Sequence, residues 1–143
     1  MSVQVAKTAG FCFGVKRAVD MAFQAARDNG PVRTLGELIH NPQIVTELDE
    51  CGVKVAGSVA ECPEGCSVVI RSHGVAKSVY REIEERGLRC VDATCPYVSK
   101  LHSIVEQCSQ EGKDILIAGD ADHPEIQGVL GYCAQKTDRQ ASG

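Results

Sequence analysis

The chain has 143 residues, of which 43% are hydrophobic and 24% are charged, a composition typical of a globular domain and not of a disordered chain. The formal net charge is −4, tryptophan is absent and aromatic residues make up 4%, which argues against nucleic acid as a partner. No apolar run is long enough to span a membrane and no basic-then-apolar leader opens the chain, so we expect no membrane partner and a cytoplasmic location.

Short apolar runs alternate with helical patterns along the whole chain. In chain order, the patterns predict a strand at 3–6, a helix at 15–26 that stops at Asn29-Gly30-Pro31, a weaker strand at 34–40, a helix opened by Asn41-Pro42, strands at 53–57 and 66–72, a helix from 75 to Gly87, a strand at 88–93, a helix from Pro96 to Gly112, a strand at 114–119 and a helix start at 122–130.

This alternation predicts an α/β protein with a mostly parallel sheet and helices on its faces. We place a domain boundary near Cys95-Pro96, where one α/β unit is complete and another begins. Residues 1–95 are then a first α/β domain, and residues 96–143 are an incomplete second one.

Eight cysteines are many for a chain without a secretory signal, so we expect buried thiols, metal ligands or reactive thiols and no disulfide framework. Cys62 and Cys66 resemble half of a zinc site without a second half, and we interpret them as loop thiols. We interpret four others as structural: Cys51, Cys90, Cys108 and Cys133.

Chemically reactive residues recur where predicted strands end, the edge at which parallel α/β sheets bind ligands. This set consists of Cys12, His40, His73, Cys95, and His123 with Glu125. A helix N-terminus favours a thiolate, which suits a soft metal or an iron–sulfur cluster, and histidines beside helix starts suit a phosphate group. The pattern predicts a soft metal centre beside a phosphate site.

Each of these residues also has an ordinary structural explanation. Taken alone, Cys12 and Cys95 would more often be small buried residues, and the histidines would be capping or solvated residues. Glu125 could be a first-turn carboxylate that the helix dipole favours.

Five motifs decide between these explanations: "GFCFGVKRAV", "IHNPQIV", "RSHGV", "VDATCPYVSKLH" and "DHPEIQGVLGY". Together they resemble the successive motifs of the 4-hydroxy-3-methylbut-2-enyl diphosphate reductase (IspH/LytB) family, and the resemblance extends from Val3 to about Cys133. It implies an iron–sulfur oxidoreductase that forms isopentenyl and dimethylallyl diphosphate, the last step of the non-mevalonate isoprenoid pathway.

The resemblance also implies roles for the reactive residues. Cys12 and Cys95 would be ligands of a 4Fe-4S cluster that the family holds with three cysteines, and electrons would come from ferredoxin or flavodoxin. His40, His73 and His123 would contact the substrate diphosphate or its reacting end. Glu125 would deliver the proton to the departing hydroxyl.

The chain departs from the family in length. Family members are longer and consist of three similar α/β domains, whereas the match here covers the first domain and the start of the second. The third cluster cysteine lies in the part that is not matched. We therefore expect the N-terminal portion of such a reductase. The alternatives are a non-catalytic remnant or assembly partner or, less favoured, a zinc or iron hydrolase using His40, His73 and His123.

Overall fold

A computed structural model describes residues 2–7, 9–28 and 30–134 of the chain. Two parts of the prediction lie outside the described residues: Asn29, at the predicted end of the first helix, and residues 135–143, at the end of the predicted second domain. In chain order the elements are α1 (Phe13–Arg27), β1 (Val32–Leu35), α2 (Pro42–Glu50), β2 (Val53–Ala56), the 3-10 helix η1 (Val59–Glu61), β3 (Ser67–Ile70), α3 (Lys77–Glu85), β4 (Arg89–Asp92), α4 (Pro96–Gln110) and α5 (Pro124–Leu130).

The four strands form one sheet in the order β2-β1-β3-β4, and every pair of neighbours is parallel. Val32 pairs with Val53 on one side and with Ser67 on the other, and Ser67 pairs with Arg89. The predicted parallel α/β architecture is confirmed. Since all strands point the same way, their carboxyl ends share one edge of the sheet, which we call the carboxyl edge.

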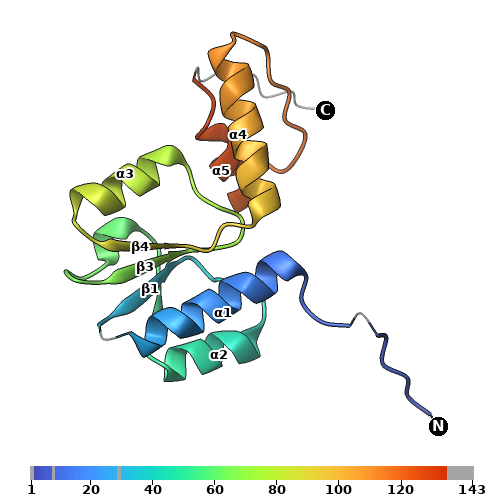
Figure 1. Cartoon of the computed structure of the whole chain (residues 1–143), viewed down its shortest axis with the longest axis vertical. Coiled ribbons are helices and arrows are strands. Elements are labelled where there is room, and N and C mark those ends of the chain that lie inside the picture. Colours follow the sequence, from blue (N-terminus) through green and yellow to red (C-terminus); the bar gives the residue numbers. More distant parts are fainter. Residues whose placement is uncertain (1, 8, 29, 135–143) are drawn as a thin grey trace.

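Helices cover both faces of this sheet (Figure 1). The core between the sheet and α1 and α2 contains Ala18, Ala22, Val32, Leu48 and Val69. The core on the α3 side contains Leu35, Val68, Ile70, Ile83 and Leu88. All four residues of β3 are buried, as expected for a central parallel strand covered on both faces.

The helices α4 and α5 lie together beyond the carboxyl edge, at the top of Figure 1. Glycines allow α5 to approach the loop after β3. A Cβ at Gly128 would lie 3.4 Å from the carbonyl oxygen of His73, and a Cβ at Gly131 would lie 2.2 Å from the Cβ of Ala76. The loop between β3 and α3 is thus the surface on which α5 packs.

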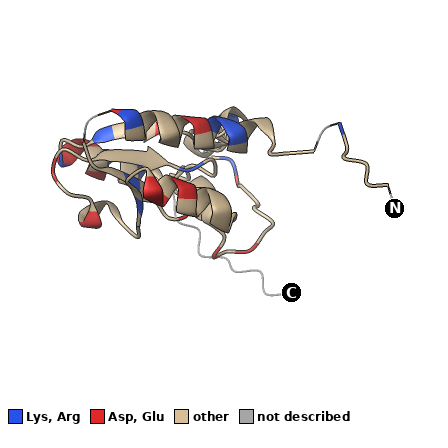
Figure 2. Cartoon of the chain, turned by 90° about the horizontal axis from the view of Figure 1, so that it is seen from below, with Lys and Arg blue, Asp and Glu red and all other residues tan. Residues whose placement is uncertain are grey.

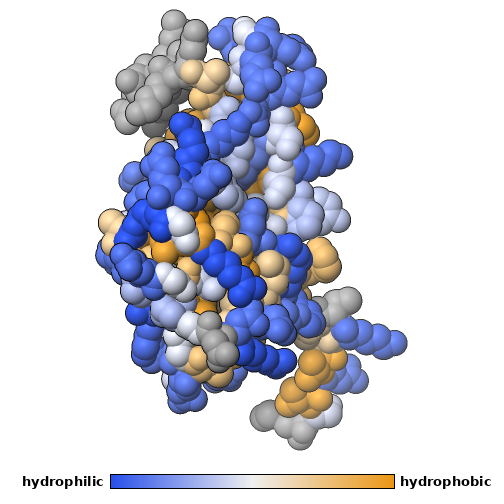
Figure 3. All heavy atoms as spheres, turned by 60° about the vertical axis from the view of Figure 1, so that its left-hand side comes forward, coloured by the Kyte–Doolittle hydropathy of each residue, from blue (hydrophilic) through white to orange (hydrophobic). Residues whose placement is uncertain are grey.

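Two predicted strands are wrong. Residues 3–6 project from the body without strand pairing (Figures 1 and 3), and Val3 and Val5 are 89% and 79% exposed. Residues 114–119 also form no strand, and Leu116 is 92% exposed. Both segments have strand-like composition, but a strand needs a neighbour for its backbone hydrogen bonds, and the described residues provide none for either.

The helix start signals are correct. The Asn41 side-chain oxygen accepts hydrogen bonds from the backbone N–H groups of Gln43 (3.0 Å) and Ile44 (3.3 Å), and Pro42 occupies the first helical turn. The helix predicted at 15–26 is α1, whose buried side includes Ala18, Ala22 and Ala25. Local sequence therefore determines both helices that cover this face.

The division of the cysteines into buried and exposed side chains differs from the prediction. Cys62 and Cys66 lie in the loop before β3, but they belong to the core on the α3 side with 2% and 0% exposure. Cys51 and Cys90, which we interpreted as structural, are exposed. Burial raises the pKa of both core thiols, so they are neutral apolar side chains in the folded protein.

Acidic and basic residues are interspersed over the helices, as Figure 2 shows, and neither sign dominates the molecule. Within the described ranges, no helix has both the length and the apolar character needed to cross a membrane. With a net charge of −4, attraction of an anion must come from local groups and not from the overall field.

Candidate functional site

Two cysteines lie near the start of α1. Cys12 is the N-cap residue of α1 and is exposed, while Cys95 is the N-cap residue of α4 and is partly buried. A Cβ at Gly14 would lie 2.7 Å from the Cys95 sulfur, so this sulfur packs on the α1 backbone two residues after Cys12. Neither cysteine side chain caps its helix, which leaves both sulfurs free for other partners.

Two hydrogen bonds hold this arrangement. The Arg17 guanidinium, on α1, donates from Nη1 to the Thr94 carbonyl oxygen at 3.1 Å. The Cys95 backbone N–H donates to the Ser72 carbonyl oxygen at 2.9 Å. The start of α4 is therefore attached both to α1 and to the end of β3. These bonds hold Cys95, at the start of α4, in a fixed position relative to α1, which begins after Cys12.

Two imidazoles form a second group at this edge. The rings of His73 and His123 are in an edge-to-face arrangement with centroids 5.6 Å apart. His123 is the N-cap residue of α5, and its Nδ1 accepts the backbone N–H of Glu125 at 3.2 Å. Because Nδ1 is an acceptor, the neutral ring carries its proton on Nε2 and can donate it to an anionic oxygen.

The charge state of His73 depends on its surroundings. Burial lowers the pKa of His73, and the positive charges of Arg71, His123 and His40 lower it further, whereas Glu125 opposes them. His73 is therefore neutral at neutral pH. Its Nδ1 is buried without a hydrogen-bond partner among the described residues.

His40 is an exposed member of the predicted site histidines. Its Nδ1 lies 3.4 Å from the Glu37 carboxylate, and its side chain is 85% exposed. His40 lies between the end of β1 and the start of α2, which places it at the carboxyl edge of the sheet.

The predicted residues reach the carboxyl edge by two routes. His40, His73 and Cys95 follow β1, β3 and β4, as the strand-end rule predicts. Cys12 and His123 follow segments that are not strands, and they reach the edge as N-cap residues of α1 and α5. The strand-end reason given for Cys12, His123 and Glu125 is wrong, because the segments before them are not strands.

His102 lies beside this group of residues, although the sequence motifs gave it no role. Its side chain is 3% exposed and stacks on Tyr132, with centroids 4.3 Å apart and an interplanar angle of 20°. A Cβ at Gly74 would lie 2.6 Å from its Cε1, so His102 fills the space between α4, the residue after His73, and the end of α5. A histidine between Leu101 and Val105 of an apolar helix face was the signal available in the sequence.

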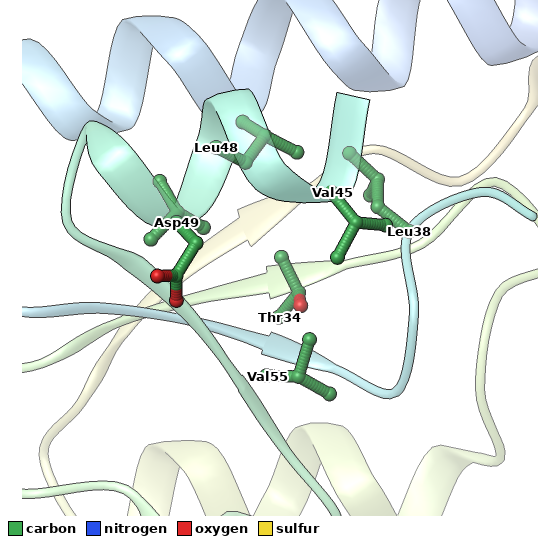
Figure 4. Close-up of a pocket in the computed structure, with 7 residues that line it drawn as sticks. Thr34, Leu38, Val45, Leu48, Asp49 and Val55 are labelled. Atoms are coloured by element: carbon green, nitrogen blue, oxygen red, sulfur yellow. The ribbon is translucent and has the colours of Figure 1, made fainter. Parts of the chain in front are cut away.

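Neither of two cavities is lined by the predicted site cysteines, histidines or Glu125. A cavity of about 30 Å³ between α2 and the sheet has mostly apolar walls and room for about one water molecule (Figure 4). A more open one of about 300 Å³ lies between α3, β4 and α4, and its lining residues are Tyr80, Asp92, Ser99, His102, Ser103 and Tyr132.

The donor set indicates which group could bind at the edge. Thiolates are ligands for soft metals and iron–sulfur clusters, so Cys12 and Cys95 fit as part of a cluster site. Among the described residues, no three Cys, His, Asp or Glu side chains are grouped closely enough to hold a metal ion. A cluster bound here would need at least one further ligand.

Fold and side chains together define the class: a parallel α/β protein with two helix-start cysteines and several histidines at one sheet edge. Two solved structures share this fold. A structure of (E)-4-hydroxy-3-methyl-but-2-enyl diphosphate reductase, the terminal enzyme of the non-mevalonate pathway, matches with a TM-score of 0.80 and 44% identity over 91% of this chain and 46% of that one. The Plasmodium falciparum E-1-hydroxy-2-methyl-but-2-enyl-4-diphosphate reductase matches with a TM-score of 0.83 and 26% identity over 88% and 40%.

The chain belongs to the LytB protein family, whose model matches residues 3–139. A 4-hydroxy-3-methylbut-2-enyl diphosphate reductase of Geotalea uraniireducens is 49% identical over 100% of this chain and 50% of its own length. A protein of the same name from Caldanaerobacter subterraneus is 44% identical over 95% and 49%. The chain thus spans about half the length of the curated relatives it matches.

Proposed function

We propose that this chain provides the N-terminal part of an iron–sulfur 4-hydroxy-3-methylbut-2-enyl diphosphate reductase. The substrate would lose its hydroxyl group as water, on uptake of two electrons and two protons, and become isopentenyl or dimethylallyl diphosphate. The names of the relatives and the family membership support the reaction class. We also propose a domain boundary near Cys95, since all four strands lie between residues 32 and 92, and a cytoplasmic location.

The diphosphate end of the substrate would bind to His40, His73 and His123. The Nε2–H of His123 is the donor that its capping interaction leaves available, because Nδ1 accepts the Glu125 backbone N–H. His73 is neutral and can donate one hydrogen bond without the cost of burying a second full charge. The edge-to-face rings of His73 and His123 would direct their donors toward one anionic group.

Cys12 and Cys95 would hold two corners of a 4Fe-4S cluster, with a third cysteine from outside this chain. Such a cluster supplies one-electron transfer and Lewis acidity at the same place, and ferredoxin or flavodoxin is the proposed electron donor. This chain would contribute by holding its two cysteines in place. Arg17 and Ser72 fix the start of α4 against α1 and β3, so Cys95 lies beside the start of α1, where Cys12 is the N-cap residue.

Glu125 would deliver a proton to the departing hydroxyl. It lies in the first turn of α5, two residues after His123, and it is partly buried. Its carboxylate also affects the pKa of His73, so it lies within electrostatic range of the imidazole pair. An acid at this place would face the same ligand as the histidines.

One observation carries the proposal. The Cys95 sulfur lies against Gly14, two residues after Cys12 and more than 80 positions away from it in sequence, at the edge where the His73 and His123 rings also pair. Independent structural roles for these side chains would not require a common location.

A chimera tests this proposal directly. Residues 1–143 would replace the matching half of the Geotalea uraniireducens relative, and the purified protein would be assayed anaerobically with a chemical reductant for release of both diphosphate products. We expect activity, with bound iron and acid-labile sulfide. Glu125→Gln should lower the rate at least about 100-fold with iron unchanged, as loss of a general acid does, and Cys95→Ser should lower the iron content.

Matched exposed positions serve as controls. Glu85→Gln and Cys51→Ser change the same residue types at exposed places and should leave rate and iron content unchanged. A folded chimera without sulfide or without product would refute the proposed function.

A further inference from the structure

Arg71 lies at the carboxyl edge in contact with a glycine that follows the neighbouring strand. Thr34 of β1 pairs with Val69 of β3, so Gly36 and Arg71, two residues further on, face each other just beyond the strands. A Cβ at Gly36 would lie 2.8 Å from Nη1 of Arg71 and 3.2 Å from its Cζ. The guanidinium therefore lies directly against the Gly36 backbone, in space that only a glycine leaves open.

This guanidinium has no compensating partner in the described part of the chain. Nε of Arg71 is buried without a hydrogen bond, and no carboxylate lies within ion-pair distance of it. Burial lowers the pKa of Arg71, which reflects the loss of water around a fixed charge. A partly buried cation that is not paired costs free energy unless another group neutralises it.

The neighbouring groups do not supply that neutralisation. Glu37 interacts with His40, and Glu125 acts on His73, while the remaining groups that affect His73 are His40, His123 and Arg71 itself. Arginine is charged at any ordinary pH, unlike these histidines. It also presents its N–H groups as a planar fork that matches phosphate oxygens.

We infer that Arg71 binds the diphosphate group of the substrate and supplies the permanent positive charge of this site, with Gly36 providing the space for its guanidinium. This inference rests on the proposed function, because it assigns a further residue to the same ligand. A purely structural arginine would instead donate its hydrogen bonds to carbonyl or carboxylate oxygens of the chain. Such bonds are absent from the described residues.

Inorganic diphosphate is the probe for this inference, and the 143-residue chain is the protein. Binding would be followed in magnesium-free buffer by calorimetry and by the ¹⁵N-detected side-chain signals of arginine and histidine. We expect the Arg71 Nε–H signal to shift on binding. Arg71→Gln should weaken diphosphate binding about 10-fold or more, since charge-assisted contacts are of this strength.

Two further variants serve as comparisons for Arg71→Gln. Arg71→Lys keeps the charge but loses the fork, so we expect a loss of affinity smaller than that of Arg71→Gln. Arg81→Gln removes an exposed arginine from α3 and should change affinity less than about two-fold, within the range of a screened surface charge. If Arg71→Gln does not fold, two other measurements test whether Arg71 binds diphosphate. They are the Arg71 Nε–H shift of the unaltered chain and the affinity of Arg71→Lys.

The outcomes separate the two proposals. If the chain binds diphosphate and His123→Gln weakens binding, but Arg71→Gln matches the unaltered chain or the Arg71 signal does not shift, the inference about Arg71 is overturned and the histidine site stands. If the unaltered chain does not bind diphosphate, both are overturned.

Discussion

Gly131→Ala should separate α5 from the sheet edge. A Cβ at this position would lie 2.2 Å from the Ala76 Cβ and 2.6 Å from its Cα, whereas non-bonded carbons prefer about 3.5–4.0 Å. One of the two segments must therefore move by about 1.3 Å or more. Gly131 has a φ of −67°, a conformation open to alanine, so the predicted effect is steric and not conformational.

Gly128→Ala is the matched control, one turn earlier on the same helix. A Cβ there would meet the His73 carbonyl oxygen at 3.4 Å and His102 Nε2 at 3.5 Å, which are ordinary contacts. Replacement of glycine by alanine in a helix stabilises by about 0.5–1 kcal/mol when the site can accept it. Overpacking typically costs about 1–3 kcal/mol, so Gly131→Ala should be less stable than Gly128→Ala by about that amount.

Urea denaturation followed by circular dichroism would measure this difference in the free energy of unfolding. The same displacement should also separate the His73 and His123 rings, which lie 5.6 Å apart, and weaken the magnetisation transfer between them in NMR spectra. Equal stability of the two variants would refute the close packing of α5 on the loop after β3.

Three further predictions concern local contacts. Asn41→Ala should cost about 1 kcal/mol in urea denaturation and Asn41→Gly only a few tenths, and equal losses would contradict the capping role. Arg17→Met removes the hydrogen bond to the Thr94 carbonyl oxygen and should cost about 0.5–1.5 kcal/mol, with faster amide exchange at the start of α4; unchanged exchange would contradict the proposed link. Burial lowers the pKa values of both His73 and His102 below the ordinary 6.5, so the unfolded chain takes up these protons first on acidification. Stability should be constant above about pH 6.5 and fall as the pH drops below it, and urea midpoints that rise toward pH 5.5 would contradict this linkage.

The sequence predicted the elements that local signals determine. The alanine-rich face of α1 and the Asn41-Pro42 start of α2 are correct because apolar spacing and capping act within a few residues. Residues 3–6 and 114–119 were wrong because strand formation also depends on a neighbouring backbone, which composition does not reveal.

The candidate site shows the same division. Strand ends and motif positions led to Cys12, Cys95 and the histidines as candidate site residues, and their roles stay a prediction. Arg71 and His102 lie inside the motifs "RSHGV" and "VDATCPYVSKLH" but were given no role, since what distinguishes them is burial without a partner and contact with glycines distant in sequence. Such features arise only when separate elements pack together.

The close approach of the Cys95 sulfur to Gly14 gives the two edge thiols unequal access to solvent. One side of the Cys95 sulfur is covered by the α1 backbone, whereas Cys12 is exposed at the tip of that helix. A small alkylating reagent such as iodoacetamide should therefore label Cys12 well before Cys95. Dissolved oxygen and peroxide meet the same asymmetry, and Cys12 is the residue at which oxidative damage to the edge begins.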